Sequence, residues 1–285
     1  MRTKCIRFFN VLFLIVSFCL FGASFAGEVI KENDILYRET ADSDYARQQC
    51  RLDVYYPEGL ETFPTLVWFH GGGLSEGIRQ WGEHVAKRFT SEGIAVVLVS
   101  YRLSPHVKCP VYIDDAAAVV AWTFKHIERY GGDSDKIFIS GHSAGGYLTS
   151  MVGIDKRYLN RYGISAEKVA GLIPISGQAV THSTIRRERG IPRGKIIVDE
   201  FAPLYYVGEA KTPFLCICGD DDLPLRAEEN RFFVAALKAA GDSESRYFEA
   251  EGRDHDSIAD RIGEQDDEVA LAMLDFIHRR IKVNN

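Results

Sequence analysis

The chain has 285 residues, of which 46% are hydrophobic and 26% are charged, and its formal net charge is −6 at pH 7. This acidic balance argues against nucleic acid or an anionic membrane as a partner. The length allows one large α/β domain with a sizeable core, and no internal repeat interrupts it. None of the six cysteines has zinc-site spacing, so we expect neither a metal ion nor a cofactor.

Residues 1–26 are predicted to be a cleaved secretory signal peptide. Arg2, Lys4 and Arg7 precede an apolar run, and small residues at Ser24 and Ala26 place the cut after Ala26. The run is short for a membrane-spanning helix, which needs about 20 residues, so cleavage is favoured over a retained anchor. The mature chain, 27–285, is then a single domain with net charge −9, secreted or periplasmic and free of the membrane.

Beyond the leader, apolar runs alternate with helical patterns. Strands are predicted at 51–57, 65–69, 94–101, 136–140, 170–176, 214–218 and 245–251, and helices at 81–93, 114–131, 144–153, 226–241 and 266–281. Strands buried on both faces that alternate with helices predict an α/β fold with a mostly parallel sheet covered on both sides. In such sheets functional groups gather at the carboxyl ends of the strands.

Two features leave alternatives open. Residues 177–210 are long, mixed in character and rich in turn residues, which fits either a lid or binding segment or a surface excursion. Cys216 and Cys218 alternate in a strand and are expected as buried thiols. Cys50 and Cys109 could pair in an oxidising compartment, but the sequence does not show whether they are close.

The strand at 136–140 is followed by "GHSAGG", residues 141–146. Gly-x-Ser-x-Gly between a strand and a helix is the pattern of a nucleophile elbow, in which a sharp turn exposes the serine hydroxyl. Ser143 is therefore the candidate nucleophile. The alternative is a glycine-rich turn with a capping serine.

Three consecutive glycines follow another strand in "HGGG", residues 70–73. Bare backbone beside Ser143 would let N–H groups approach an oxygen on which negative charge develops. We assign these oxyanion donors to the N–H groups of Gly72, Gly73 and Ala144. His70 is expected to shape the loop by hydrogen bonding.

A serine nucleophile needs a base, and the base needs an orienting acid. In the order Ser, acid, His, the histidines after Ser143 are His182, His255 and His278. His255 is favoured because it follows the last predicted strand, whereas His278 falls within the final helix and His182 in the irregular segment. The acid should follow the strand at 214–218, where Asp220, Asp221 and Asp222 stand together, and periodicity does not choose among them.

With these residues in place, the chain resembles the α/β-hydrolase superfamily. It is similar to the esterase branch that contains carboxylesterases, Bacteroidetes-type feruloyl and acetyl xylan esterases, and kynurenine formamidases. The similarity covers about residues 50–282 and rests on "HGGG", "SYRLSP", "GHSAGG", "GDDDLP" and "DHDSI". The resemblance implies that Asp222, three residues after Gly219, is the acid, and it supports His255. Relatives usually carry an aromatic residue directly after the glycine loop, where this chain has Leu74.

The resemblance implies a serine esterase that works through an acyl-enzyme on a small-molecule or polysaccharide ester. Export together with the resemblance favours acetyl or feruloyl esters of plant polysaccharide as the substrate. One alternative is an arylformamidase-like amidase, although export argues against it. Another is a non-catalytic binding protein, similar to the neuroligin-type adhesion proteins. Such relatives typically lose a triad member, whereas all three candidates are present here.

Overall fold

The computed structural model describes residues 27–38 and 43–283. The predicted signal peptide, 1–26, lies outside the described residues. Within the described part of the chain, no helix is both long and apolar enough to cross a membrane.

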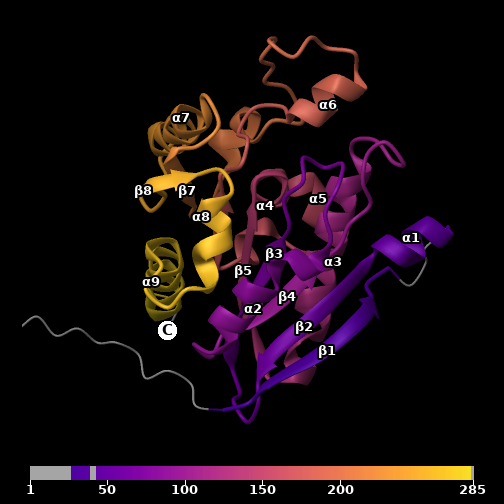
Figure 1. Cartoon of the computed structure of the whole chain (residues 1–285), viewed down its shortest axis with the longest axis vertical. Helices are drawn as coiled ribbons and strands as arrows, with labels where there is room; N and C mark the ends of the chain where they lie inside the picture. Colours follow the sequence, from indigo (N-terminus) through magenta and orange to yellow (C-terminus); the bar gives the residue numbers. More distant parts are fainter. Residues whose placement is uncertain (1–26, 39–42, 284–285) are drawn as a thin grey trace, which may run out of the picture.

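Eight strands of the described residues form one sheet in the order β1-β2-β4-β3-β5-β6-β7-β8 (Figure 1). Neighbours from β4 onward are parallel, and β1 and β2 add an antiparallel edge. This arrangement confirms the predicted fold class. The strands are β1 (Val29–Leu36), β2 (Arg51–Pro57), β3 (Phe63–Phe69), β4 (Ala95–Val99), β5 (Gly132–His142), β6 (Gly171–Ile175), β7 (Leu215–Asp221) and β8 (Arg246–Asp254).

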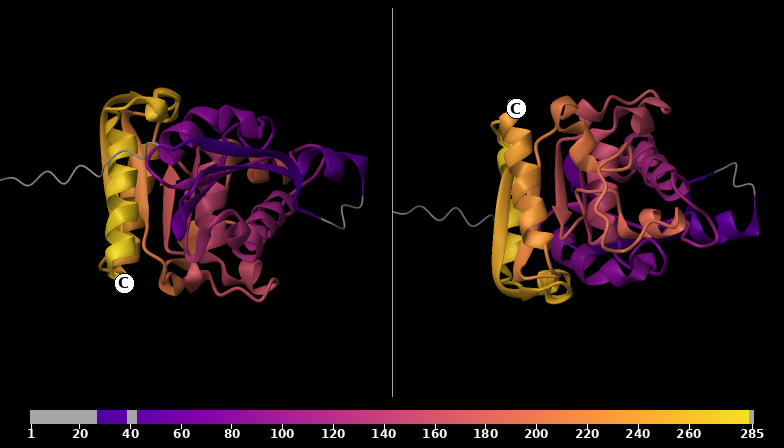
Figure 2. Two further views of the ribbon diagram at one scale, coloured as in Figure 1. Left: turned by 90° about the horizontal axis from the view of Figure 1, so that it is seen from below. Right: turned by 90° about the horizontal axis from the view of Figure 1, so that it is seen from above.

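Helices connect the strands and cover the sheet. The α-helices are α1 (Asp44–Gln49), α2 (Glu83–Thr90), α3 (Val111–His126), α4 (Ala144–Ile154), α5 (Lys156–Asn160), α6 (Ser183–Glu188), α7 (Arg226–Ala239), α8 (Ser257–Asp260) and α9 (Glu268–Val283). Short 3-10 turns are η1 (Arg79–Gly82), η2 (Ile127–Tyr130), η3 (Ala166–Lys168), η4 (Pro203–Glu209) and η5 (Arg261–Gly263). Helices α1 and α9 lie at opposite ends of the molecule (Figure 2).

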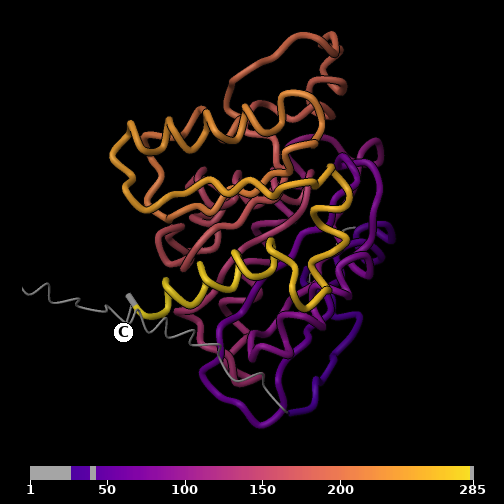
Figure 3. The backbone as a smooth tube through the Cα atoms, turned by 60° about the vertical axis from the view of Figure 1, so that its left-hand side comes forward, coloured from indigo at the N-terminus to yellow at the C-terminus, as the bar shows by residue number. Residues whose placement is uncertain are grey.

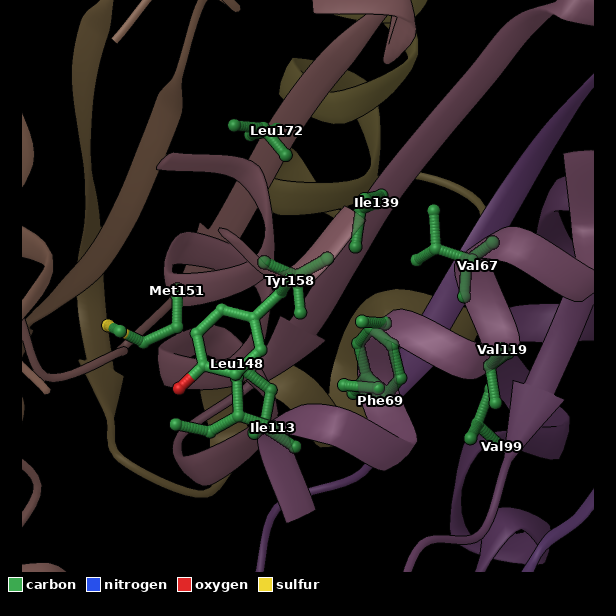
Figure 4. Close-up of a cluster of buried hydrophobic side chains, with 14 of the residues drawn as sticks. Val67, Phe69, Val99, Ile113, Val119, Ile139, Leu148, Met151, Tyr158 and Leu172 are labelled. Carbon is green, nitrogen blue, oxygen red and sulfur yellow. The ribbon is translucent and has the colours of Figure 1, made fainter. Parts of the chain in front are cut away.

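The sheet separates two hydrophobic cores. Strand β4 shows the alternation: Val97 and Val99 pack into the core under α3 and α4, whereas Val96 and Leu98 pack into the core under α2 and α9. Side chains of a strand point alternately to its two faces, so a five-residue apolar run contributes to both cores. Figure 4 shows the α3–α4 side, with Leu148 and Met151 from α4, Ile113 and Val119 from α3, and Val67, Phe69, Val99 and Ile139 from the strands.

The sequence of helix α2 explains how this helix packs on the sheet. Its buried apolar residues, Val85, Ala86 and Phe89, lie on one face, as amphipathic spacing requires. Glu83 stands in its first turn and Lys87 in its last, which complements the helix dipole at both ends. At the other end of the sheet, β7 and β8 lie between α7 and α9 (Figure 3).

The structure adds elements that the sequence did not predict. Strand β1 has the sequence VIKENDIL and lies at the exposed sheet edge, so it lacks an apolar period. The 177–210 segment contains α6 and η4. Glu229 of α7 accepts hydrogen bonds from the N–H groups of Ala179 and Val180, which fastens the start of this segment to the domain.

The four cysteines of the described residues are free. Cys216 and Cys218 are buried thiols, as predicted. Cys50 and Cys109 do not form the disulfide that the sequence left open, and burial raises the pKa of Cys50 to about 11 and that of Cys109 to about 12.

Candidate active site

Ser143 stands at the turn between β5 and α4 with φ 55° and ψ −112°. A positive φ is rare for a residue with a side chain, and its backbone N–H donates to the Ile175 carbonyl at 2.8 Å. The flanking glycines permit the turn because the backbone of β3 passes close by. A Cβ atom would lie 2.6 Å from the Phe69 carbonyl oxygen at Gly141 and 2.0 Å from it at Gly145.

The structure brings the three candidate triad residues together. His255 Nε2 lies 2.9 Å from Ser143 Oγ, and His255 Nδ1 lies 2.7 Å from Asp222 Oδ1. A carboxylate can only accept, so Nδ1 carries the proton and Nε2 presents a lone pair to the serine hydroxyl. In this tautomer the imidazole can take a proton from Ser143.

The Asp222 carboxylate is almost fully enclosed, since 1% of its side chain is exposed. Its Oδ1 also accepts the Leu223 N–H, and its Oδ2 accepts the Ser176 hydroxyl. Burial alone would raise the pKa of Asp222, but the hydrogen bonds from His255 and Ser176 hold it below its usual value. The carboxylate is therefore charged at neutral pH.

The glycine loop after β3 passes beside Ser143. A Cβ atom at Gly71 would lie 3.5 Å from Ser143 Cβ, and at Gly72 it would lie 2.2 Å from the Glu76 carbonyl oxygen. Gly72 and Gly73 both have positive φ values, 99° and 61°, which glycine adopts without strain. Among the hydrogen bonds of the described residues, none uses the N–H groups of Gly72, Gly73 or Ala144 as donor.

His70 shapes this loop, as predicted. Its ring stacks on Tyr101 at a centroid distance of 4.3 Å, and its Nδ1 lies 2.6 Å from the Gly71 carbonyl oxygen. Tyr101 in turn donates its hydroxyl to the His70 carbonyl at 2.8 Å. Burial lowers the pKa of His70 to about 4, so the ring is neutral at pH 7.

The side chains of the other aspartate and histidine candidates, all within the described residues, make no hydrogen bond to the triad. Asp220 Oδ1 accepts the Arg253 N–H at 3.2 Å, which joins β7 to β8, and Asp221 is exposed. His182 is buried and caps α6 by accepting the Thr184 N–H. His278 is exposed on α9. Among the candidate histidines only His255 bonds Ser143, and among the three aspartates only Asp222 bonds the His255 ring.

Comparisons with known proteins find similarity to esterases in both sequence and structure. The BD-FAE family model matches residues 52–173. Esterase LipC of Mycobacterium tuberculosis is 29% identical over 225 residues, which cover 72% of this chain and 56% of LipC. An esterase of Pyrobaculum calidifontis has a TM-score of 0.64 and 25% identity, covering 79% of both chains. Esterase B of Lactobacillus rhamnosis has a TM-score of 0.73 and 23% identity, covering 90% of this chain and 87% of that one.

The chain has the α/β-hydrolase fold. Its matches lie in the esterase branch, and the chain spans about half the length of the first curated relatives it matches, 56% of LipC and 52% of LipM. The family-model match begins in β2 and ends in β6, so it includes the glycine loop and Ser143 but neither Asp222 nor His255.

A cavity of about 500 Å³ lies against Ser143 and His255. The glycine loop, Asp256 and helix α8 line it, together with Trp81. Glu76, Asp256 and Asp260 bring carboxylates to this cavity, and its lining residues among those described include no lysine or arginine. A cavity of this size lies within the range that binds small molecules.

Two polar contacts at the site were not predicted from the sequence. His142 Nε2 lies 2.6 Å from the His255 carbonyl oxygen, and Ser176 donates to Asp222. Burial lowers the pKa of His142 to about 3, and the repulsion that the two protonated rings of His142 and His255 would feel adds to this effect. His142 lies inside the Gly-x-Ser-x-Gly pattern, but its spacing gives no sign of this contact. No group of three or more His, Cys, Asp or Glu side chains within 27–38 and 43–283 is placed to hold a metal ion.

Proposed function

We propose that this α/β-hydrolase is a secreted serine esterase that hydrolyses carboxylic esters through an acyl-enzyme on Ser143. The observation that carries the proposal is the line of hydrogen bonds from Asp222 through His255 to Ser143, which ends at the 500 Å³ cavity. Similarity to esterases over most of the chain supports it.

In acylation, His255 Nε2 removes the proton from Ser143 Oγ as the oxygen attacks the ester carbonyl carbon. The carbonyl oxygen becomes an oxyanion, for which the N–H groups of Gly72, Gly73 and Ala144 are the proposed donors. Asp222 stabilises the imidazolium of His255. The imidazolium then gives its proton to the leaving alcohol oxygen, and the tetrahedral adduct collapses to the acyl-enzyme.

Deacylation repeats these steps with water. His255 takes a proton from water as its oxygen attacks the acyl carbon, and then returns a proton to Ser143 Oγ when the carboxylic acid leaves. Every proton in the cycle passes through His255 Nε2, so the position of that ring limits both halves of the reaction.

For the substrate we propose acetyl or feruloyl esters of plant polysaccharide. The exposed indole of Trp81 and the three carboxylates of the cavity offer an apolar surface and hydrogen-bond acceptors, which suit a hydroxylated alcohol. A panel of esters of increasing acyl length, assayed beside acetylated and feruloylated xylan, tests this choice. Faster cleavage of an aryl formamide than of any ester would favour an amidase instead.

Ser143→Ala tests the reaction itself. The change removes the nucleophile, and loss of a triad serine costs several powers of ten in kcat. Wild-type protein should hydrolyse p-nitrophenyl acetate and react with a fluorophosphonate at Ser143, whereas the variant should do neither with its fold intact. A variant that keeps more than a tenth of the wild-type rate, or an inactive wild type, contradicts the proposal.

Export is the second part of the proposal and has its own measurement. If the leader is cut after Ala26, protein recovered outside the cytoplasm should begin at Gly27. Intact mass and N-terminal sequencing of that fraction decide it, and an unprocessed cytoplasmic chain would refute export without touching the chemistry.

A further inference from the structure

Ser176 follows the last residue of β6 and has an unusual backbone. Its φ is 51°, in the left-handed region that favours glycine, and the residue is fully buried. A side chain held there costs free energy, and glycine would adopt the same backbone without that cost. The hydroxyl group of Ser176 should therefore make a contact that offsets this cost.

Every polar group of Ser176 has a partner. Its N–H donates to the Ile217 carbonyl at 2.7 Å, and its carbonyl accepts a hydrogen bond from the buried Arg226 guanidinium. Its hydroxyl donates to Asp222 Oδ2. Main-chain bonds on both sides thus fix the residue, so the hydroxyl is held in one place relative to β7.

The hydroxyl completes the enclosure of the Asp222 carboxylate. Oδ1 accepts from His255 Nδ1 at 2.7 Å and from the Leu223 N–H at 2.6 Å. Oδ2 accepts from Ser176. Because both carboxylate oxygens accept hydrogen bonds, the carboxylate cannot rotate without breaking one of them. Oδ1 therefore stays in line with the imidazole.

The preceding residue serves the other end of the triad. The Ile175 carbonyl accepts the Ser143 N–H at 2.8 Å. Two consecutive residues at the end of β6 therefore hold both the proposed nucleophile and the proposed acid. They lie between β5 and β7, at the point where His255 connects Ser143 with Asp222.

We infer that Ser176 is a positioning residue, which fixes the Asp222 carboxylate so that it holds His255 in the tautomer that activates Ser143. The inference rests on the proposed function. Ser176 does not touch substrate, so its loss should lower kcat and leave KM nearly unchanged. Removing its hydroxyl also raises the pKa of Asp222, since that bond helps to lower it.

The test compares Ser176→Ala with Ser176→Gly. Both remove the hydroxyl, but glycine also relieves the left-handed backbone. A hydrogen bond to a charged group predicts a loss in kcat of about 10- to 100-fold for both variants. Ser140→Ala is the matched control, because Ser140 is a buried serine whose hydroxyl bonds only the Ile173 carbonyl. It should change kcat less than twofold. Wild-type kcat in Ser176→Gly would overturn the inference.

A double variant shows whether the effect passes through Asp222. In an Asp222→Asn background, Ser176→Ala should cost less than twofold, because the carboxylate that it positions is gone. An undiminished loss there would mean that Ser176 acts on the fold.

A readout independent of turnover separates this inference from the proposed function. The proton between His255 Nδ1 and Asp222 should give a low-field NMR resonance in the wild type. Ser176→Ala should shift or broaden it, whereas Ser140→Ala should not. An inactive wild type whose resonance responds this way would refute the esterase and retain the positioning role, and an unmoved resonance would refute that role alone.

Discussion

His142 holds the backbone of His255, since its Nε2 lies 2.6 Å from the His255 carbonyl oxygen. The ring nitrogen must be the donor, because a carbonyl can only accept. The rings of the two histidines lie 4.8 Å apart. The residue that precedes the proposed nucleophile thus fixes the backbone of its proposed base.

We predict that His142→Ala lowers kcat by about 2- to 10-fold, which corresponds to one ordinary hydrogen bond. The loss arises because the His255 loop can then shift away from Ser143. Steady-state kinetics on an activated ester measures it, with His278→Ala as the control, since His278 is exposed on α9. Unchanged kcat in a folded His142→Ala would show that the other contacts of the loop suffice.

The neighbouring aspartates give the sharpest test of the triad. Asp222→Asn keeps the shape of the side chain but can favour the wrong tautomer of His255, which costs about 10⁴ in rate in a comparable triad. Asp221→Asn should have little effect, because Asp221 is exposed. Asp220→Asn should cost about 1 kcal/mol of stability at most, because its oxygen bonds one backbone N–H of β8.

The measurement is kcat of the three single variants on one ester, beside their melting temperatures. An Asp222→Asn enzyme within tenfold of wild type would remove Asp222 from the proposed mechanism. Collapse of kcat in Asp220→Asn at unchanged stability would point to that residue as the acid.

Charge in the cavity predicts discrimination among alcohols. Glu76, Asp256 and Asp260 line it, and a carboxylate about 8 Å from an anion in water disfavours it by about 0.5 kcal/mol, or about twofold. An acetylated glucuronide should therefore have a severalfold lower kcat/KM than the matched neutral glucoside. The difference should shrink in 0.5 M salt, because ions screen exposed charges.

The double variant Asp256→Asn/Asp260→Asn should raise kcat/KM for the glucuronide ester by about fourfold to fivefold and leave the neutral ester unchanged. Asp266→Asn is the control, since Asp266 is exposed and outside the cavity. Equal responses of the two esters would show that the alcohol lies elsewhere.

Stability should fall in mild acid because three buried histidines stay neutral in the folded protein. Burial lowers the pKa of His70 to about 4, and burial with neighbouring positive groups lowers those of His142 and His182 to about 3. In the unfolded chain these groups take up protons below pH of about 6.5. The unfolded state then binds more protons, so the free energy of unfolding decreases as pH falls from about 6.5 to 4.

Each of the three histidines contributes up to about 1.4 kcal/mol per pH unit in that window. Urea unfolding at several pH values measures the slope. His182→Asn retains a side chain that can cap α6 but does not titrate, so it should reduce the slope by about that amount. His278→Asn should leave it unchanged, and an equal slope in all three proteins would assign acid sensitivity to other groups.

Local sequence determined the parts of this protein that consecutive residues build. The spacing of Gly141, Ser143 and Gly145 predicts the elbow, because the same few residues make the turn and leave room for β3. Apolar runs predicted the strands from β2 to β7, since burial on both faces leaves a dense hydrophobic signal, whereas the side chains of β8 are mostly exposed or half-buried. Strand β1 was not predicted, because only one of its edges is paired and its side chains are largely exposed.

Only the tertiary structure decided which side chains meet. Residue patterns left Asp220, Asp221 and Asp222 equivalent, and the choice of Asp222 came from family resemblance. In the structure a register shift between β7 and β8, after Gly219, separates the three, so that Asp220 bonds the backbone while Asp222 bonds His255. His142 and Ser176 contact residues 113 and 46 positions away. Hydrogen bonds require atoms within about 3 Å in space, a condition that neither composition nor periodicity encodes.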